Sequence, residues 1–166
     1  SMAFGTGTHP TTRLCLEAAE KYIEAGQPVI DVGCGSGILS IAAALLGASD
    51  ILAVDIDNAA VISTRENATA NNVLERIETG IGSVKEIKTG CFSRKQAPLV
   101  MANILAPVII RLFESRLADL ISPGGKIILS GILAEQVGSI NTAAESRGLT
   151  LVEKFQMEDW VALVYQ

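Results

Sequence analysis

Histidine and paired cysteines, the residues that most often build metal sites and nucleophile–base pairs, are nearly missing from this sequence. It has one histidine, His9, and three cysteines, Cys15, Cys34 and Cys91, with no C-x-x-C pair. An odd number of widely spaced cysteines argues against a disulfide framework and a zinc site. We therefore expect no metal and a cytoplasmic protein. Because no histidine lies near Cys34, we predict that this thiol packs beneath its loop and is not a catalytic nucleophile.

Basic residues and long apolar runs are also scarce. Thirteen Lys and Arg stand against 18 Asp and Glu, which gives a net charge of −5 and a pI near 4.9. Direct nucleic-acid binding is not expected, because phosphate contacts require clustered basic side chains. The longest apolar runs, residues 38–48 and 98–110, are too short and interrupted to cross a membrane. The 166 residues are long enough for one domain with a substantial core.

What the sequence does contain is a glycine loop between a strand pattern and a helix pattern. Residues 29–37 read Val-Ile-Asp-Val-Gly-Cys-Gly-Ser-Gly, and an apolar helix pattern follows at once. Gly33, Gly35 and Gly37 let the backbone turn sharply and let a ligand approach without meeting a Cβ atom. The helix that begins there offers free backbone N–H groups and the positive end of its dipole. The pattern is typical of a nucleotide-type cofactor site.

The spacing within this loop favours S-adenosylmethionine (SAM) over a dinucleotide. A G-x-G-x-x-G fingerprint would have its third glycine where this chain has Ile38. Asp31, just before the loop, can pair with a cationic ligand but would crowd a pyrophosphate. Asp55 ends a second strand about 20 residues after Gly33, the position from which a carboxylate binds ribose hydroxyls. The two carboxylates fit SAM, whose sulfonium is positive, and a NAD-binding oxidoreductase remains the alternative.

Strand and helix patterns alternate along the rest of the chain, which predicts a doubly wound, mostly parallel, seven-stranded α/β sheet. The expected strands are 29–32, 50–54, 77–81, 99–102, 126–130, 150–155 and 160–165. The expected helices begin at residues 10–12 and end before Gly26, and then cover 37–46, 57–70, 107–121 and 134–147. Residues 82–97 are polar and contain glycine, so they are expected to be a loop, with room for one helical turn. The last two strands are so close in sequence that they must form an antiparallel hairpin.

The order of these elements and the loop at residues 31–37 resemble the class I, Rossmann-like SAM-dependent methyltransferases. Three further stretches are more specific: Ala-Phe-Gly-Thr-Gly-Thr-His-Pro-Thr-Thr at 3–12, Ala-Asn-Ile-Leu-Ala at 102–106, and Leu-Ser-Gly-Ile-Leu at 129–133. With Glu-Asp-Trp-Val-Ala at 158–162, they resemble the bacterial ribosomal protein L11 methyltransferases over essentially the whole chain.

This resemblance implies methyl transfer from SAM to amino groups, on lysines or the N-terminus, of a large-subunit ribosomal protein, with S-adenosylhomocysteine as the other product. It assigns cofactor contacts to Thr12, Gly33, Asp55 and Asn103. The neighbouring positions expected in the same pocket are Phe4, Thr6, Asp31, Gly35, Ile56 and Ser83. One departure is Ala97-Pro98, where family members usually have an acidic residue. The other is the family's N-terminal domain, which docks the ribosomal protein and is absent from residues 1–166, so we expect these residues to be the methyltransferase domain alone.

Asn103, at the end of the fourth predicted strand, is the expected catalytic residue. Its side-chain oxygen can accept a hydrogen bond from the incoming amine. The alternative role is a cap for helix 107–121, although a polar residue inside an apolar run is otherwise poorly placed. Ala106 stands where base-methylating enzymes have an aromatic residue that stacks on a flipped base, which disfavours a nucleobase substrate. A methyltransferase for a small-molecule amine and a non-catalytic SAM-binding module stay open as alternatives.

Overall fold

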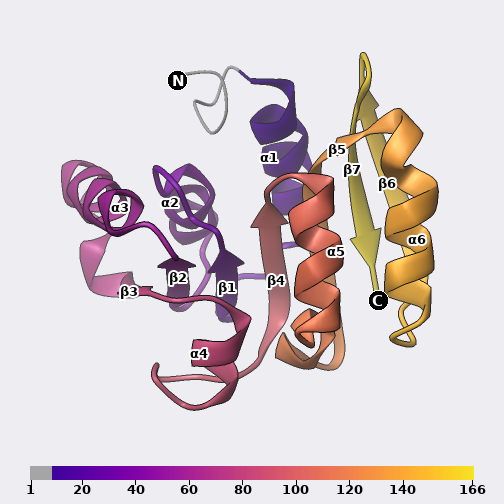
Figure 1. Ribbon diagram of the computed structural model, residues 1–166. Coiled ribbons are helices and arrows are strands. Elements are labelled where there is room, and N and C mark those ends of the chain that lie inside the picture. The colour runs from indigo at the N-terminus through magenta and orange to yellow at the C-terminus, as the bar shows by residue number, and fades with distance from the viewer. Residues whose placement is uncertain (1–8) are drawn as a thin grey trace.

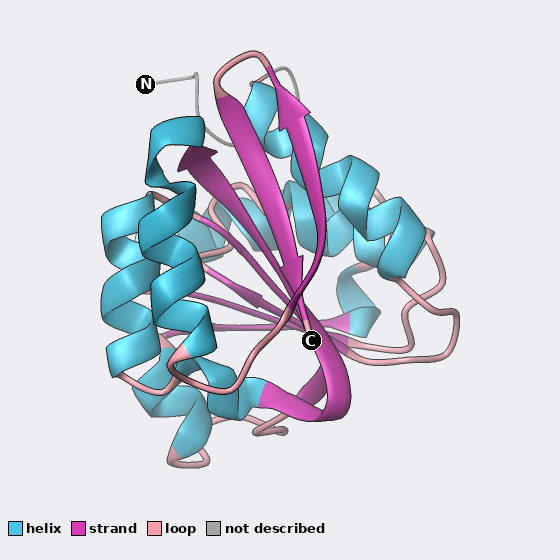
Figure 2. Ribbon diagram, turned by 90° about the vertical axis from the view of Figure 1, so that its right-hand side faces the viewer, coloured by secondary structure: helices cyan, strands magenta, loops and turns pink. Residues whose placement is uncertain are grey.

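A computed structural model describes residues 9–166 and shows a seven-stranded sheet with helices on both faces (Figures 1 and 2). The strand order is β3-β2-β1-β4-β5-β7-β6. The parallel strands are β1 (Val29–Val32), β2 (Ile51–Asp55), β3 (Ile77–Ile81), β4 (Ala97–Asn103) and β5 (Ile121–Leu133). The strand β7 (Trp160–Tyr165) runs antiparallel between β5 and β6 (Leu151–Met157). The predicted sheet with a C-terminal antiparallel hairpin is confirmed.

Three helices cover each face of the sheet. One face carries α1 (Pro10–Tyr22), α2 (Ile38–Leu45) and α3 (Asn58–Ala70), and the other carries α4 (Val84–Lys88), α5 (Ala106–Glu114) and α6 (Val137–Glu145). Because side chains alternate along a strand, Ile30 and Val32 pack toward α4, α5 and α6, whereas Val29 packs toward α1 and α2. The central strands are buried on both faces, which explains why they are apolar except for Asp31 and for the residues at their carboxyl ends.

Two helices begin at residues whose side chains satisfy free N–H groups of the first turn. The His9 ring accepts a hydrogen bond from the Thr11 N–H at 3.2 Å, and Pro10 occupies the first position of α1. The Asp57 carboxylate accepts from the Ala59 N–H at 2.9 Å and caps α3. Among residues 9–166, no helix combines the length and apolarity needed to cross a bilayer.

Two predicted helices are shorter than expected. The helix predicted over 107–121 ends at Glu114, because Arg116 adopts a left-handed conformation (φ 75). A 3-10 helix, η2 (Leu117–Leu120), follows and buries its two leucines. The helix predicted over 134–147 starts as a separate 3-10 turn, η3 (Ala134–Gln136), and α6 ends at Glu145.

One further segment contains the single helical turn that was expected, and another contains more regular structure than expected. The segment 82–97 contains α4, held by a capping box between Ser83 and Glu86. The strand β5 begins at Ile121 and therefore includes the Pro-Gly-Gly sequence that reads as a turn. A Cβ atom at Gly125 would lie 2.8 Å from the Pro98 carbonyl oxygen, so this part of β5 can approach β4 closely only because it is glycine.

Candidate functional site

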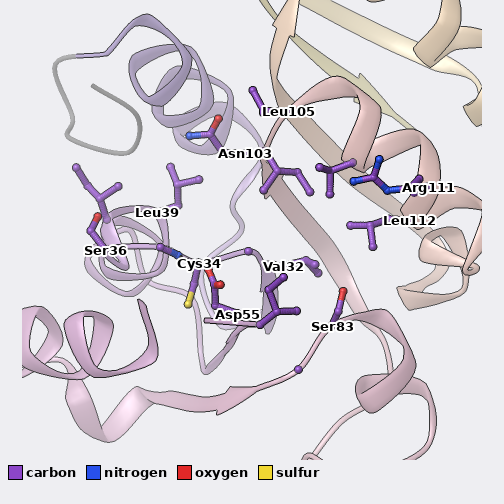
Figure 3. Close-up of a pocket in the computed structure, with 17 residues that line it drawn as sticks. Val32, Cys34, Ser36, Leu39, Asp55, Ser83, Asn103, Leu105, Arg111 and Leu112 are labelled. Atoms are coloured by element: carbon purple, nitrogen blue, oxygen red, sulfur yellow. Dashed lines mark hydrogen bonds between the residues drawn. The ribbon is translucent and has the colours of Figure 1, made fainter. Parts of the chain in front are cut away.

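A cavity of about 580 Å³ lies at the carboxyl ends of β1, β2 and β4 (Figure 3). It is formed by the glycine loop, the residues that end β2 and β4, the start of α4 and one side of α5. The strand order reverses between β1 and β4, and ligands of doubly wound sheets bind at such a point. Most of the lining is apolar, which is typical of pockets for small molecules. Its polar side chains are those of Ser36, Asp55, Ser83, Asn103 and Arg111.

The glycine loop fits closely against the elements around it. Gly33, Gly35 and Gly37 all have positive φ (77, 54 and 85), a region that side-chain-bearing residues rarely adopt. A Cβ atom at Gly33 would lie 2.7 Å from Ile104 Cγ2, and one at Gly37 would lie 2.8 Å from Thr64 Cγ2. Glycine is therefore required here for backbone conformation and for space.

The Asp55 carboxylate is held at the floor of the cavity by two backbone N–H groups. Its Oδ2 accepts from Gly35 and its Oδ1 accepts from Asp57, both at 3.0 Å. A carboxylate has about four acceptor sites, so each oxygen can accept a further hydrogen bond. Asp55 can thus bind two adjacent hydroxyl groups of a ligand without rearranging.

Asn103 presents a buried oxygen that lacks a partner. Its Nδ2 donates a long hydrogen bond, 3.5 Å, to Thr12 Oγ1, and its Oδ1 has no hydrogen-bond partner among the described residues. The residue before α5 is Leu105, so the alternative role of Asn103 as a helix cap is wrong. A buried acceptor without a partner is costly, which indicates a place for an N–H group of a ligand.

Asp31 lies behind the glycine loop, outside the cavity lining, and is 1% exposed. Its Oδ2 accepts from Ser40 Oγ at 2.7 Å, and its Oδ1 has no partner in the described part of the chain. Burial raises the pKa of Asp31 to about 6, although the hydrogen bond from Ser40 opposes the shift. Asp31 pairs with Met101 of β4, so Asp31 and Asn103 lie on the same face of neighbouring strands.

Cys34 is a buried neutral thiol. Thr64 Oγ1 donates to its Sγ at 3.3 Å, and only 7% of the residue is exposed. Burial, followed by the charge of Asp31, raises the pKa of Cys34 to about 12. Because the thiolate is the nucleophilic form, Cys34 is inert near pH 7, and its predicted packing role is confirmed.

The structure brings most of the sequence-predicted site residues together. Those that line the cavity are Gly33, Gly35, Asp55, Ile56, Ser83 and Asn103. Thr12 lies beside it through its contact with Asn103. Phe4 and Thr6 lie outside the described residues.

The sequence did not lead us to predict that α5 forms one wall of the cavity. Val108, Arg111 and Leu112 line the cavity from this helix, together with Leu105 before it. The spacing of three and four residues places the first three on one side of the helix. The available signal was Arg111 itself, a charged residue in the middle of a largely apolar helix.

The first turn of α1 is tied to the sheet next to Asn103. Ser130 Oγ, at the position of β5 that pairs with Asn103, donates to the Thr11 carbonyl oxygen at 2.8 Å. The ring of His9 packs edge-on against Trp160, with 5.2 Å between centroids. These contacts hold the first turn of α1, and with it Thr12, beside Asn103. Trp160 packs against His9 and is absent from the cavity lining.

The family model for "Ribosomal protein L11 methyltransferase (PrmA)" matches residues 1–166. The chain belongs to this family. It is 45% identical over 163 residues to the L11 methyltransferase of Bacillus subtilis and 47% identical to that of an Exiguobacterium species, covering 98% of this chain and 50% of each relative. The chain thus spans about half the length of the curated relatives that it matches.

Solved structures share the fold. The crystal structure of a ribosomal protein L11 methylase from Lactobacillus delbrueckii superposes with a TM-score of 0.86 at 31% identity, covering 96% of this chain and 80% of that one. The tRNA methyltransferase TrmK of B. subtilis superposes with a TM-score of 0.70 at 21% identity, covering 91% and 64%. Two of the stretches that resembled the L11 methyltransferase family in the sequence lie at or beside the cavity: residues 102–106 include Asn103, Ile104 and Leu105 of its lining, and residues 129–133 contain Ser130, which pairs with Asn103.

Proposed function

We propose that this chain is a SAM-dependent methyltransferase domain that transfers methyl groups to amino groups, on lysines or the N-terminus, of ribosomal protein L11. The observation that carries the proposal is the unpartnered Asn103 oxygen beside the glycine loop. It offers an acceptor where an amine would enter, at the cavity that also holds Asp55. Membership of the L11 methyltransferase family supports the choice of reaction and substrate. The free cysteines are consistent with action in the reducing cytoplasm.

The residues present fit SAM. Asp55 would accept hydrogen bonds from the two ribose hydroxyls, and the glycine loop admits close approach of the ligand to the backbone. The Asp31 charge lies directly behind that loop and favours a cationic ligand in front of it. Thr12 and Asn103 would border the amino-acid end, while Ile56 and Ser83 line the opposite part of the cavity.

When bound, SAM supplies a methyl group on a positively charged sulfur. The remaining task is to present a neutral amine in line with the bond that breaks. A lysine amine has a reference pKa of roughly 10.4, and burial in the largely apolar cavity lowers it. Asn103 Oδ1 would accept an N–H of the neutral amine and so orient its lone pair.

The described residues that line the cavity include no free general base. The Cys34 thiol stays protonated because its pKa is raised, Arg111 is a permanent cation, and the free acceptor sites of Asp55 are taken by the ribose hydroxyls in the proposed complex. We therefore propose that the amine loses its proton to water on entering the site, and that catalysis rests on alignment and desolvation.

The test has two stages. Calorimetry should show binding of SAM and S-adenosylhomocysteine and no binding of NAD. Labelled SAM with purified ribosomal protein L11 should then give a methylated product, and mass mapping should place the methyl groups on amines. NAD binding without SAM binding would overturn the cofactor assignment. Transfer to small amines, with none to ribosomal protein L11, would instead favour the small-molecule alternative.

A further inference from the structure

The cavity has two chemically different ends (Figure 3). Near α1 and α2 it is bordered by Asn103 and Ser36, and Asp31 lies behind. Beyond Asp55 it continues along α5, where the walls are aliphatic. The residues of this α5 compartment are Val32, Ser83, Val108, Arg111 and Leu112. A planar, mostly apolar group fits this end better than a zwitterion does. A zwitterion would lose its hydration there, and the compartment does not offer both a positive and a negative side chain to pair with its two charges.

Arg111 is the one charge in the α5 compartment. It is exposed and makes no hydrogen bond or ion pair with any residue from 9 to 166. Two other arginines are held by ion pairs, Arg94 with Asp50 and Arg116 with Asp119. The guanidinium at the cavity is thus available to a ligand without breaking an existing contact.

The proposed function fixes which part of the ligand reaches Arg111. With the ribose at Asp55 and the amino-acid end at Asn103, the adenine base is the part that remains for the α5 compartment. Guanidinium planes stack on nucleobases, and their N–H groups also donate to ring nitrogens, which accept. We propose that Arg111 binds the adenine base of the cofactor and sets the affinity of this site for adenine nucleosides. This inference rests on the proposed function.

The test uses neutral ligands, so that the charge of Arg111 does not repel the probe. S-adenosylhomocysteine and 5′-methylthioadenosine share the adenosine group, and the second lacks the amino-acid end. Arg111→Ala should weaken binding of both by a similar factor, roughly 2- to 30-fold, the range from an exposed to a desolvated cation–π contact. Arg111→Lys keeps the positive charge but lacks the planar guanidinium group, so most of the loss of affinity should remain. Isothermal calorimetry measures all these affinities without turnover.

Arg147→Ala is the matched control, because it makes the same change in net charge at an exposed site outside the cavity lining. It should leave both affinities unchanged. If Arg111→Ala leaves them unchanged while the unmodified chain binds both ligands, the Arg111 assignment is wrong and the proposed function stands. Loss for S-adenosylhomocysteine alone would place Arg111 at the amino-acid end and also overturn the assignment. Failure of the unmodified chain to bind either ligand would overturn the proposed function itself.

Discussion

The backbone N–H of Gly35 donates to the Asp55 carboxylate at 3.0 Å, so the loop after β1 and the end of β2 hold each other in position. The ligand-facing glycine loop and the acidic residue about 20 positions later therefore act as one unit. Loss of the Asp55 carboxylate would remove the proposed ribose contact and also release one N–H of the loop.

Asp55→Ala should weaken binding of S-adenosylhomocysteine by on the order of 1.5–3 kcal/mol, the value of hydrogen bonds to a charged group. Calorimetry gives the affinity directly. Asp57→Ala is the control, since this carboxylate caps α3 and is absent from the cavity lining. It should lower the free energy of unfolding by about 0.5–2 kcal/mol and leave the affinity unchanged. The ribose assignment fails if Asp55→Ala lowers stability but not affinity.

Asn103→Ala should reduce kcat for methyl transfer about 100-fold, because the amine loses the acceptor that orients it. Affinity for S-adenosylhomocysteine should fall less, by about tenfold at most, the value of one neutral hydrogen bond. Thr12→Val removes the hydroxyl that Asn103 contacts and keeps the side-chain shape, so its effect on kcat should be smaller. Equal fractional losses in kcat and affinity for Asn103→Ala would show that Asn103 only holds the cofactor.

Asp31→Asn should make the protein more stable at pH 7. The pKa of Asp31 is raised from 3.8 to about 6, chiefly by burial, so the folded protein binds this proton more tightly than the unfolded chain does. Stability therefore falls as pH rises between these two values, and the loss is complete above the higher one. The shift corresponds to about 3 kcal/mol at pH 7 and to almost nothing at pH 3. Urea unfolding of both proteins at each pH measures the difference.

Asp31→Asn should also weaken binding of SAM, because the charge behind the glycine loop is lost.

Asp119→Asn is the comparison for stability, because the pH dependence of its effect on the free energy of unfolding should have the opposite sign. Hydrogen bonds from Arg116 and Lys88 lower the pKa of Asp119, so its carboxylate stabilises the fold above its ordinary pKa, and this contribution is lost as pH falls. A variant Asp31→Asn that is no more stable than the parent at pH 7 would contradict the burial argument.

Gly33→Ala should destabilise the protein more than Gly35→Ala does. Both residues have positive φ, so each alanine costs about 1–2 kcal/mol of backbone strain. At Gly35 a Cβ atom would meet nothing within 4 Å, whereas at Gly33 it would lie 2.7 Å from Ile104 Cγ2. Thermal unfolding should therefore give the lower Tm for Gly33→Ala. Equal Tm values would show that Ile104 moves aside at no cost.

The sheet and the glycine loop could be predicted because their signals are local. Apolar strands buried on both faces, glycines at alternate positions and acidic strand ends are all visible over a few residues. The end of α5 could not be predicted in this way. The apolar pattern continues to Ile121, and the chain leaves the helix at Arg116, a residue that gives no turn signal. Burial of Leu117 and Leu120 in the core, a tertiary effect, decides the change.

The site residues divide in the same way, into those that local sequence signals could predict and those that they could not. Asp55 and Asn103 could be placed from strand ends alone, because the carboxyl ends of parallel strands meet at one edge of a sheet. The position of Asp31 behind the loop depends on Ser40 of α2, and the Arg111 wall depends on how α5 packs over Val32. The first depends on a contact across the loop, nine residues along the chain, and the second on contacts between segments that are distant along the chain.

The close fit of Gly33 against Ile104, and of Gly37 against Thr64, bears on how this domain can be recombined. A chimera that transplanted only β1 and its loop into another sheet would carry the glycines but would leave behind the two side chains shaped around them. The segment to be exchanged between two proteins therefore runs from β1 through α3, and the β4–α5 junction must be taken from the same protein. Hybrids between family members should therefore fold best when their crossover points lie outside residues 29–70 and when position 104 comes from the same parent.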